Sequence, residues 1–514
     1  MSGYTSLGKK SGNGVGGGGD LNSNAVGPFG TTLTSDMTPI GQAAFVYTVN
    51  NTMWTTGSTG VGASITASNG VMTCSSGNST SGSAFVRLIR NNKYRAGQGS
   101  MGRFTAIFNS GAPDALQLAG MFNGESGFWF CVSGSNSFGV LHRESSKQEI
   151  RSFTITSAPA GAATLVVTLA GDPITIAING GASANQTSYQ ISQIDYSNVG
   201  RGWTAESIDG VVYFVSNVPG PLGGTFSITN TGVSIATAAT VQAGVLPVET
   251  FVSQSQWNVD TMDGSGPSRF TLDRTKGNVY GIGYQYLGFG NVSFSVEDPE
   301  TGLLTKCHMV RRAGSGTSTV VQNPNMSVGW MAINSGSGAS SVTVKGASAG
   351  SFTEGQVARN VGVGFTIAAS KSSVGATEVP IFTIRANRIY SNMCCYGEVT
   401  PVNMTVANDA GNASSGKLLK VQVYKNASLG GPVNFAAVDV RSMVAYDTAA
   451  TSFTTNSRTQ LLKSFIVAAN NSMDLPLLGE GIFVSSGETL TVTVQRVSSD
   501  VDTAAVTLSW FEDQ

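Results

Sequence analysis

Residues 277–302 constrain the fold more than any other segment, because apolar and polar residues alternate there with a period of two. The apolar faces of its two runs consist of Tyr280, Ile282, Tyr284 and Tyr286, and then of Val292, Phe294 and Val296. This alternation is typical of a β-strand with one buried face, whereas a helix repeats every 3.6 residues. Residues 287–290 are rich in glycine and join the two runs. The segment therefore predicts two antiparallel strands and their turn.

Composition extends this prediction to the whole chain. Of its 514 residues, 40% are hydrophobic and only 11% are charged, and 65 are glycine. Ordinary soluble domains contain about 25% charged residues and about 7% glycine. A chain with short apolar runs, many turn residues and abundant β-branched side chains favours β-sandwiches over helical bundles. We therefore expect an all-β protein built from tandem antiparallel β-sandwiches.

The charge balance bears on possible partners. The formal net charge is −1, and no long basic run is present, so nucleic acid is not an expected partner. A surface with few ions and little net charge favours association with other subunits. No apolar run is long enough to span a membrane, and the first residues lack the apolar segment of a secretion signal. We expect assembly in a cytoplasm without Sec-type export.

Few residues suit catalysis or metal binding. The five cysteines are scattered and predict free, mostly buried thiols. His142 and His308 lie in apparent strands and are interpreted as structural residues. Residues 346–350 match the G-x-S-x-G string, but no helix pattern follows them, as a nucleophile elbow requires. We expect no catalytic residue, no cofactor and no metal, and we predict that the protein is not an enzyme.

The order of these patterns predicts the domain organisation. Residues 1–43 form a Gly-rich N-terminal arm, with Lys9 and Lys10 as its only early charges, and we interpret it as a docking arm. Residues 44–152 and 246–348 are the two halves of one sandwich, beginning with a strand at 45–49. Residues 153–245 are a small α+β module inserted at an exposed loop tip. Residues 349–514 form a C-terminal β-sandwich, which begins after a glycine-bearing stretch at about 346–355.

Local signals refine two of these regions. In the inserted module, residues 165–169 and 174–178 predict a hairpin, and Thr187 followed by Gln190 predicts the N-terminus of a short helix. In the C-terminal sandwich, strands at 419–423, 490–494 and 506–510 alternate apolar and polar residues. Their polar faces are expected to be open to solvent or to a neighbouring subunit.

Aromatic residues provide the binding hypothesis. Trp257 lies in a polar stretch and is the ring expected to be exposed to solvent, whereas Trp129 and the tyrosines of residues 280–286 are expected in a core. Trp257, Asp263 and Arg269 are the candidate contacts for a glycan or a partner, because sugars stack on flat rings flanked by polar groups. The acidic residues around 260–273 resemble a cation-binding loop only loosely, and residues 297–302 are expected to form a tight turn.

Three segments carry a family resemblance: residues 93–108, the strands and turns at 277–302, and residues 508–513. Together they resemble virion structural proteins of tailed phages and large DNA viruses, of the fibre, collar or capsid-associated kind. The first two resemble a lectin-like or jelly-roll-like sandwich. The resemblance implies location in the virion, other virion proteins as partners, and a homo-oligomer with a trimer favoured. The alternative is a host-attachment lectin that binds surface glycans through the split sandwich.

Overall fold

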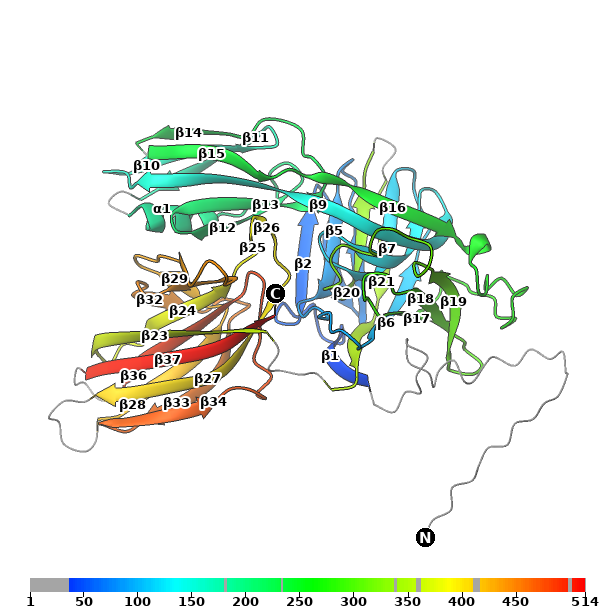
Figure 1. The fold of residues 1–514 in the computed structure, drawn as a ribbon. Coiled ribbons are helices and arrows are strands. Elements are labelled where there is room, and N and C mark those ends of the chain that lie inside the picture. The colour runs from blue at the N-terminus through cyan, green and yellow to red at the C-terminus, as the bar shows by residue number, and fades with distance from the viewer. Residues whose placement is uncertain are drawn as a thin grey trace, which may run out of the picture.

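The computed structural model describes residues 37–179, 183–232, 234–336, 340–356, 362–409, 417–497 and 502–513. These residues form almost only antiparallel strands, which confirms the predicted all-β class. Figure 1 shows two lobes, with a long sheet extending from the first lobe over the second. The predicted hairpin is present, because Tyr280 pairs with Val296 and Tyr284 with Val292.

Two large sheets form the first sandwich. One contains, in order, β19 (Leu304–Val310), β18 (Val292–Glu297), β17 (Asn278–Tyr284), β6 (Ser100–Phe108), β21 (Thr343–Gly346), β4 (Val71–Ser75) and β3 (Ser64–Ser68), and β22 (Ser348–Glu354) joins β6 to β1 (Met37–Ala44). The other contains β12 (Trp203–Ile208), β13 (Val211–Pro219), β9 (Ser137–Ser157), β8 (Gly127–Ser133), β7 (Ala115–Phe122), β20 (Ser327–Asn334), β5 (Ser83–Leu88) and β2 (Trp54–Thr59), and β15 (Ser234–Gln242) and β16 (Val245–Ser253) also pair with β9.

Aromatic side chains fill the space between these sheets. Trp330 of β20 lies among Phe45, Trp54 and Phe104, with ring centroids 5.6, 5.7 and 6.5 Å away. Its indole nitrogen donates a hydrogen bond of 3.0 Å to the carbonyl oxygen of Thr105 in β6. Trp330 thus connects the two facing sheets through the packing of its ring and through the hydrogen bond of its indole nitrogen.

A second core lies beyond the end of the first sandwich. Here β9 continues past its pairing with β8, and its last residues pair with β13 and β15. A small sheet of β11 (Asp172–Ile178), β10 (Ala163–Leu169) and β14 (Ser227–Thr231), together with α1 (Ala184–Ser192), packs against this extension. We call this region, which lies within the predicted bounds 153–245 and has a buried cluster of its own, the inserted module. The predicted hairpin at 165–178 is β10 and β11.

The helix starts earlier than its sequence signal indicates. Ser183 is the N-cap, and its hydroxyl accepts a hydrogen bond of 3.1 Å from the backbone nitrogen of Gln186. Thr187, the predicted cap, lies inside the helix and is fully buried. The prediction was wrong by one turn, because serine caps a helix as well as threonine does and the Thr187 side chain is used in packing.

Two further sheets form the C-terminal sandwich. One contains β23 (Val363–Val374), β37 (Asp502–Asp513), β27 (Glu398–Asp409) and β34 (Asn471–Pro476), with β35 (Val484–Ser485) also on β27. The other contains β30 (Ala436–Ala437), β31 (Val444–Asp447), β24 (Val379–Ala386), β36 (Thr489–Arg496), β28 (Leu419–Lys425) and β33 (Gln460–Val467). Short pairs complete it: β25 (Ile389–Tyr390) with β26 (Met393–Cys394), and β29 (Ser428–Gly430) with β32 (Ser452–Thr454).

Three strand predictions need correction. Residues 37–43, expected in the arm, belong to β1, which pairs with β22 and is fixed by that ladder. Residues 46–49, expected in a strand, lie outside the strands, and Tyr47 is 95% exposed. Residues 348–354, expected in a loop, are β22, because small side chains suit its position between β1 and β6.

The polar face predicted for β36 is not open to solvent. Thr491 and Thr493 are fully buried. The hydroxyl of Thr383 donates to that of Thr491 at 3.0 Å, and Thr493 donates to a carboxylate oxygen of Glu378. β36 lies between β24 and β28, so neighbouring strands supply partners that its sequence could not reveal.

We expect Trp330→Ala to lower the free energy of unfolding of the first sandwich by about 3–5 kcal/mol, because it leaves a large cavity between the sheets. Guanidinium titration followed by tryptophan fluorescence measures the change. Tyr47→Ala is the matched control: its ring is 95% exposed, so the effect should stay within about 0.5 kcal/mol. Equal effects of the two substitutions would contradict this account of the core.

Candidate functional site

Trp257, the predicted exposed ring, is buried. It follows the short 3₁₀ turn η2 (Gln254–Gln256) and is 5% exposed. Its ring lies 6.0 Å from that of Phe130 and 5.9 Å from that of Phe138. The expectation of exposure was wrong, because the turn leaves the preceding glutamines in contact with solvent while the indole enters the core. Trp129 and Tyr280 are buried as predicted.

Asp263 and Arg269 are exposed residues of one loop that follows this tryptophan in the chain. Asp263 accepts hydrogen bonds from the hydroxyl and backbone nitrogen of Ser265 and from the hydroxyl of Thr261, and these bonds lower its pKa to about 2. Asp260 holds the loop from inside, because its carboxylate accepts from backbone nitrogens at both ends. Of the three predicted contacts, Asp263 and Arg269 therefore lie on the same loop, whereas the Trp257 ring is buried in the core. Lys9 and Lys10 lie outside the described residues.

Both histidines hold backbone segments in place. His142 is 7% exposed, its Nε2 lies 2.5 Å from the carbonyl oxygen of Val320, and its ring stacks on Phe128. Because a carbonyl only accepts, Nε2 carries the proton. His308 is 5% exposed, and its Nδ1 accepts from the backbone nitrogen of Asn258. These contacts agree with the predicted structural role.

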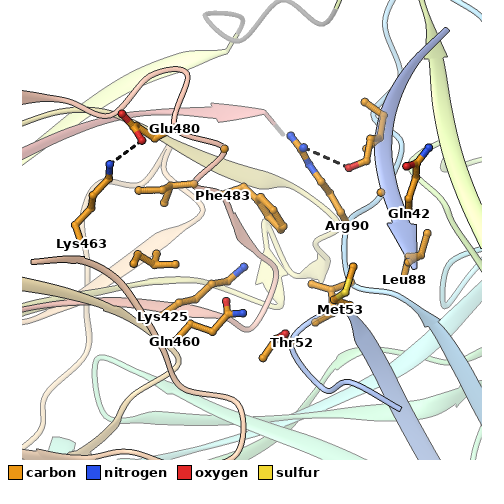
Figure 2. Close-up of a pocket in the computed structure, with 16 residues that line it drawn as sticks. Gln42, Thr52, Met53, Leu88, Arg90, Lys425, Gln460, Lys463, Glu480 and Phe483 are labelled. Atoms are coloured by element: carbon orange, nitrogen blue, oxygen red, sulfur yellow. Dashed lines mark hydrogen bonds and ion pairs between the residues drawn. The ribbon is translucent and has the colours of Figure 1, made fainter. Parts of the chain in front are cut away.

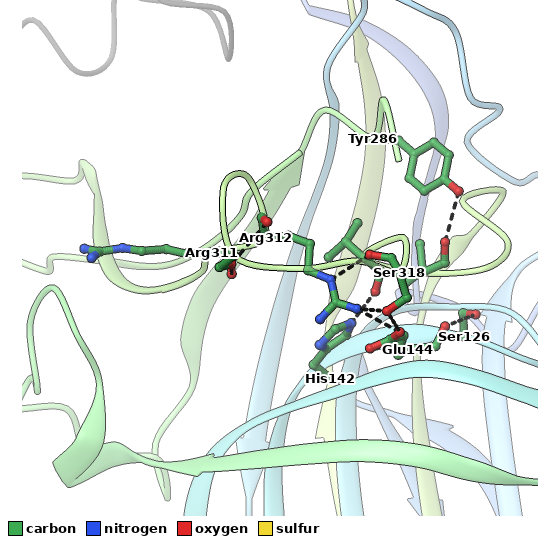
Figure 3. Close-up of polar contacts among 10 residues, drawn as sticks. Ser126, His142, Glu144, Tyr286, Arg311, Arg312 and Ser318 are labelled. Atoms are coloured by element: carbon green, nitrogen blue, oxygen red, sulfur yellow. Dashed lines mark hydrogen bonds and ion pairs between the residues drawn. The ribbon is translucent and has the colours of Figure 1, made fainter. Parts of the chain in front are cut away.

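The loop beside His142 is also held by an ion pair (Figure 3). Arg312 lies 2.9 Å from a carboxylate oxygen of Glu144 in β9 and donates to the carbonyl and hydroxyl of Ser318. The Ser318 hydroxyl donates to the same carboxylate. Arg311, by contrast, points away from the cluster. These contacts therefore hold residues 312–320 against β9. The Arg312 guanidinium and the Glu144 carboxylate are both engaged in them.

A short segment after β5 joins the first sandwich to the C-terminal one. Its contacts are the two-pronged pair of Arg90 with Glu398 (3.0 and 3.1 Å), the bond from the Lys93 ammonium to the carbonyl of Tyr396, and the ion pair of Arg95 with Asp513 (2.7 Å). We call residues 90–95 the clasp. The Arg90 and Glu398 positions lie 308 residues apart in the sequence, so no local pattern could have identified them.

A cavity of about 450 Å³ lies beside the clasp. Figure 2 shows the ring of Phe483 between two cations: the Arg90 guanidinium lies 4.7 Å from its centroid and the Lys425 ammonium 4.0 Å. Lys425 comes from the C-terminal sandwich and is paired at 2.7 Å with buried Glu488. The aromatic ring thus reinforces the contact between sandwiches.

The chemistry of this cavity is that of an apolar contact site. Its lining contains aliphatic side chains from both sandwiches: Ile40, Met53, Leu88, Ile89, Leu462 and Ile482. Its one carboxylate, that of Glu480, is paired at 2.6 Å with Lys463. Among the described residues, no group of His, Cys, Asp and Glu is placed to hold a metal ion. No helix in the described ranges is long and apolar enough to cross a membrane.

No protein-family model and no curated protein sequence matches the chain. Among solved structures, the Emp46p carbohydrate recognition domain is 10% identical, with 60% of this chain and 98% of that chain covered and a TM-score of 0.19. An archaeal virus protein with a triple jelly roll is 9% identical, with 94% and 98% covered and a TM-score of 0.17. A protein of infectious bursal disease virus Gx strain is 8% identical, with 82% and 73% covered and a TM-score of 0.16. Viral proteins recur among these weak neighbours, but such low scores do not establish a shared fold.

We expect Arg90→Met to lower the free energy of unfolding by about 2 kcal/mol, because it leaves the buried carboxylate of Glu398 without its partner. Arg103→Met is the control, since its pair with Glu297 is more exposed, with side-chain exposures of 46% and 28%, and should cost less than about 1 kcal/mol. Denaturant titration measures both, and limited proteolysis should cleave between the sandwiches faster only in the Arg90 variant. Equal losses would refute the role of the clasp.

We expect the protein to lose stability as the pH falls below about 6.5. Burial lowers the pKa of His142 from 6.5, and burial and then Arg311 lower that of His308. The unfolded chain therefore takes up protons first, and the free energy of unfolding falls until the lower, folded pKa values are passed. Urea midpoints at pH 7.5 and 5.5 measure this loss.

The double variant His142→Gln/His308→Gln isolates the two rings, since glutamine can still donate a hydrogen bond to Val320. Its midpoint should change less with pH than that of the native chain. Burial raises the pKa of Glu125 and Asp447, which acts in the opposite direction in both proteins. Parallel pH curves for the two proteins would disprove the histidine effect.

Proposed function

We propose that this protein is a structural component of a virus particle, of the fibre, collar, tail- or capsid-associated kind. It assembles as a homo-oligomer, with a trimer favoured, and docks on other virion proteins through the predicted arm at 1–43, in the part before β1, where Lys9 and Lys10 supply the early charge. In this proposal its domains are the split sandwich (44–152 and 246–348), which β1 and β22 extend to residues 37 and 354, the module at 153–245, and the rest of the C-terminal sandwich (349–514).

The observation that carries the proposal is that the three segments of the family resemblance meet in space. β6 pairs with β17 from Ser100 and Tyr284 to Ala106 and Asn278. Arg95, just before β6, pairs at 2.7 Å with Asp513 at the end of β37. Figure 1 shows that β37 ends where the two lobes meet. The three segments that carry the resemblance are far apart in the sequence but lie in one connected part of the fold.

Exposed apolar edges support an oligomer. β33 and β34 are the edge strands of the two sheets of the C-terminal sandwich. They expose Leu461 (52%), Ile466 (53%) and Met473 (39%). Each strand also carries one charged residue: Lys463 is paired with Glu480, and Asp474 accepts a hydrogen bond from Thr405. Because these charges are used within the chain, the exposed apolar residues of the edges suit a face covered by another subunit.

The alternative, a host-attachment lectin, lacks its expected stacking ring because Trp257 is buried. Its candidate contacts are reduced to Asp263 and Arg269, and attachment to glycans through them remains the alternative proposal. A glycan array separates the two functions, since the structural role requires no glycan binding.

A quantitative mass-spectrometric inventory of purified particles tests the proposal. We expect the chain at a fixed copy number for each particle, and its absence would refute a virion role. Particles that carry Lys9→Glu/Lys10→Glu should contain less of the chain than particles with the control Lys276→Glu/Arg311→Glu, which reverses two exposed charges elsewhere. Equal incorporation would refute docking through the arm lysines.

A further inference from the structure

A second cavity lies between the inserted module and the C-terminal sandwich. Its volume is about 390 Å³. One wall comes from α1 and β12, and the other from the turns that follow β24, β28, β32 and β35. The lining is mainly polar, and the residues that define it are Tyr189, Glu206, Arg388, Asn426, Asn456 and Arg458.

Arg388 is held firmly at the base of this cavity. Its backbone nitrogen donates to both carboxylate oxygens of Glu206, at 3.1 and 2.9 Å. Its guanidinium lies directly against the backbone of Gly487, where a Cβ atom would be 2.3 Å from the Cζ atom of Arg388. Because Gly487 also has a φ of +82°, glycine is required there, and its lack of a side chain leaves the space that the guanidinium fills.

Arg458 lies on a loop that is fixed on the same side. Its backbone nitrogen donates to the side-chain oxygen of Asn456 at 2.8 Å. The amide nitrogen of Asn456 donates to the carbonyl of Asn426 at 3.2 Å and to the hydroxyl of Ser428 at 2.8 Å. The backbone that carries Arg458 is therefore positioned before any ligand arrives.

The carboxylates near these arginines are used by other donors. Glu206 accepts from the backbone of Arg388 and Ile389, and Glu488 accepts from the Lys425 ammonium at 2.7 Å and from Asn426. Among the described residues, no ion pair or side-chain hydrogen bond engages the guanidinium of Arg388 or Arg458. Arg385, in contrast, donates to the carbonyl of Ser207 at 2.6 Å.

Two cations without acceptors therefore face one cavity. Burial lowers the pKa of Arg388, Glu206 raises it, Arg458 lowers it again, and Glu488 raises it. Like charges around a partly desolvated space are unfavourable unless an anion neutralises them. The planar guanidinium is the side chain best suited to bind a carboxylate, sulfate or phosphate through two hydrogen bonds.

We propose that this cavity binds a small oxyanion group, sulfate, phosphate or carboxylate, between Arg388 and Arg458. The cavity is also larger than a single ion. Its lining also includes Ser192 and Gln193 at the end of α1 and Ser457 on the facing loop, and these polar side chains suit a carrier such as a sugar ring. The site thus suits an oxyanion alone or the same group on a monosaccharide.

Isothermal titration of the full chain tests the site, with sodium sulfate, sodium phosphate, N-acetylneuraminic acid and galactose 6-sulfate as probes. The ionic strength is kept constant with sodium chloride. At least one probe should bind in a one-to-one ratio, and the sugar-borne groups should bind more tightly than the free ions because they fill more of the cavity. Failure of all four probes to bind would overturn the proposal.

Arg458→Gln should weaken binding at least about tenfold, because it removes one of the two guanidinium groups from an exposed position that the fold does not need. The matched control, Arg311→Gln, removes one exposed arginine in the first sandwich and should bind as the native chain does. Thermal unfolding without ligand checks that both variants are folded. Unchanged affinity in Arg458→Gln, or an equal loss in the control, would overturn the assignment.

Discussion

A single strand connects the parts of this molecule. β9 has 21 residues, whereas strands in globular proteins usually have about five or six. Its first half lies between β8 and β16 in the first sandwich, and its second half lies between β13 and β15 in the inserted module. Two cores therefore share one continuous hydrogen-bond ladder. A shift in the register of β9 would disturb both, because each one-residue slip moves every side chain to the opposite face.

The position of the inserted module follows from this strand. The extension of β9 carries β13 and β12 over the C-terminal sandwich, as Figure 1 shows. There, Ile150 and Val215 pack against Ile389. Glu206 at the same junction binds the backbone of Arg388. The arginine-lined cavity is thus a consequence of where β9 places α1 and β12, and neither lobe could form it alone.

Local sequence identified the elements whose partners lie nearby. The alternation in residues 280–296 was enough to place β17 and β18, since each strand pairs with its neighbour in the chain. The middle of β9 was missed because residues 143–151 are mostly polar and resemble a loop. Their charges are satisfied by distant partners, such as Glu249 for Arg143 at 2.6 Å and Glu125 for Lys147 at 3.4 Å.

The candidate sites were even harder to predict from local sequence, because distant parts of the chain form their surroundings. Trp257 has polar neighbours in sequence but aromatic neighbours in space, so composition around it indicated the wrong environment. Residues 206, 388 and 458 carry no common motif, and only the tertiary fold brings them to one cavity. Asp263 and Arg269 could be placed on one loop because they are close in the chain.

The scarcity of charge makes the placement of each ion informative. With only 11% charged residues, the chain solvates its surface mainly through uncharged polar groups. Several of its charged side chains instead form ion pairs where the two lobes meet, namely Arg90 with Glu398 and Arg95 with Asp513. Such partly buried pairs fix orientation more than they add stability, because desolvation offsets much of their attraction. Against this pattern of paired ions at junctions, Arg388 and Arg458 are the exception, because the nearby carboxylates of Glu206 and Glu488 accept from other donors, and a site for an external anion requires such an exception.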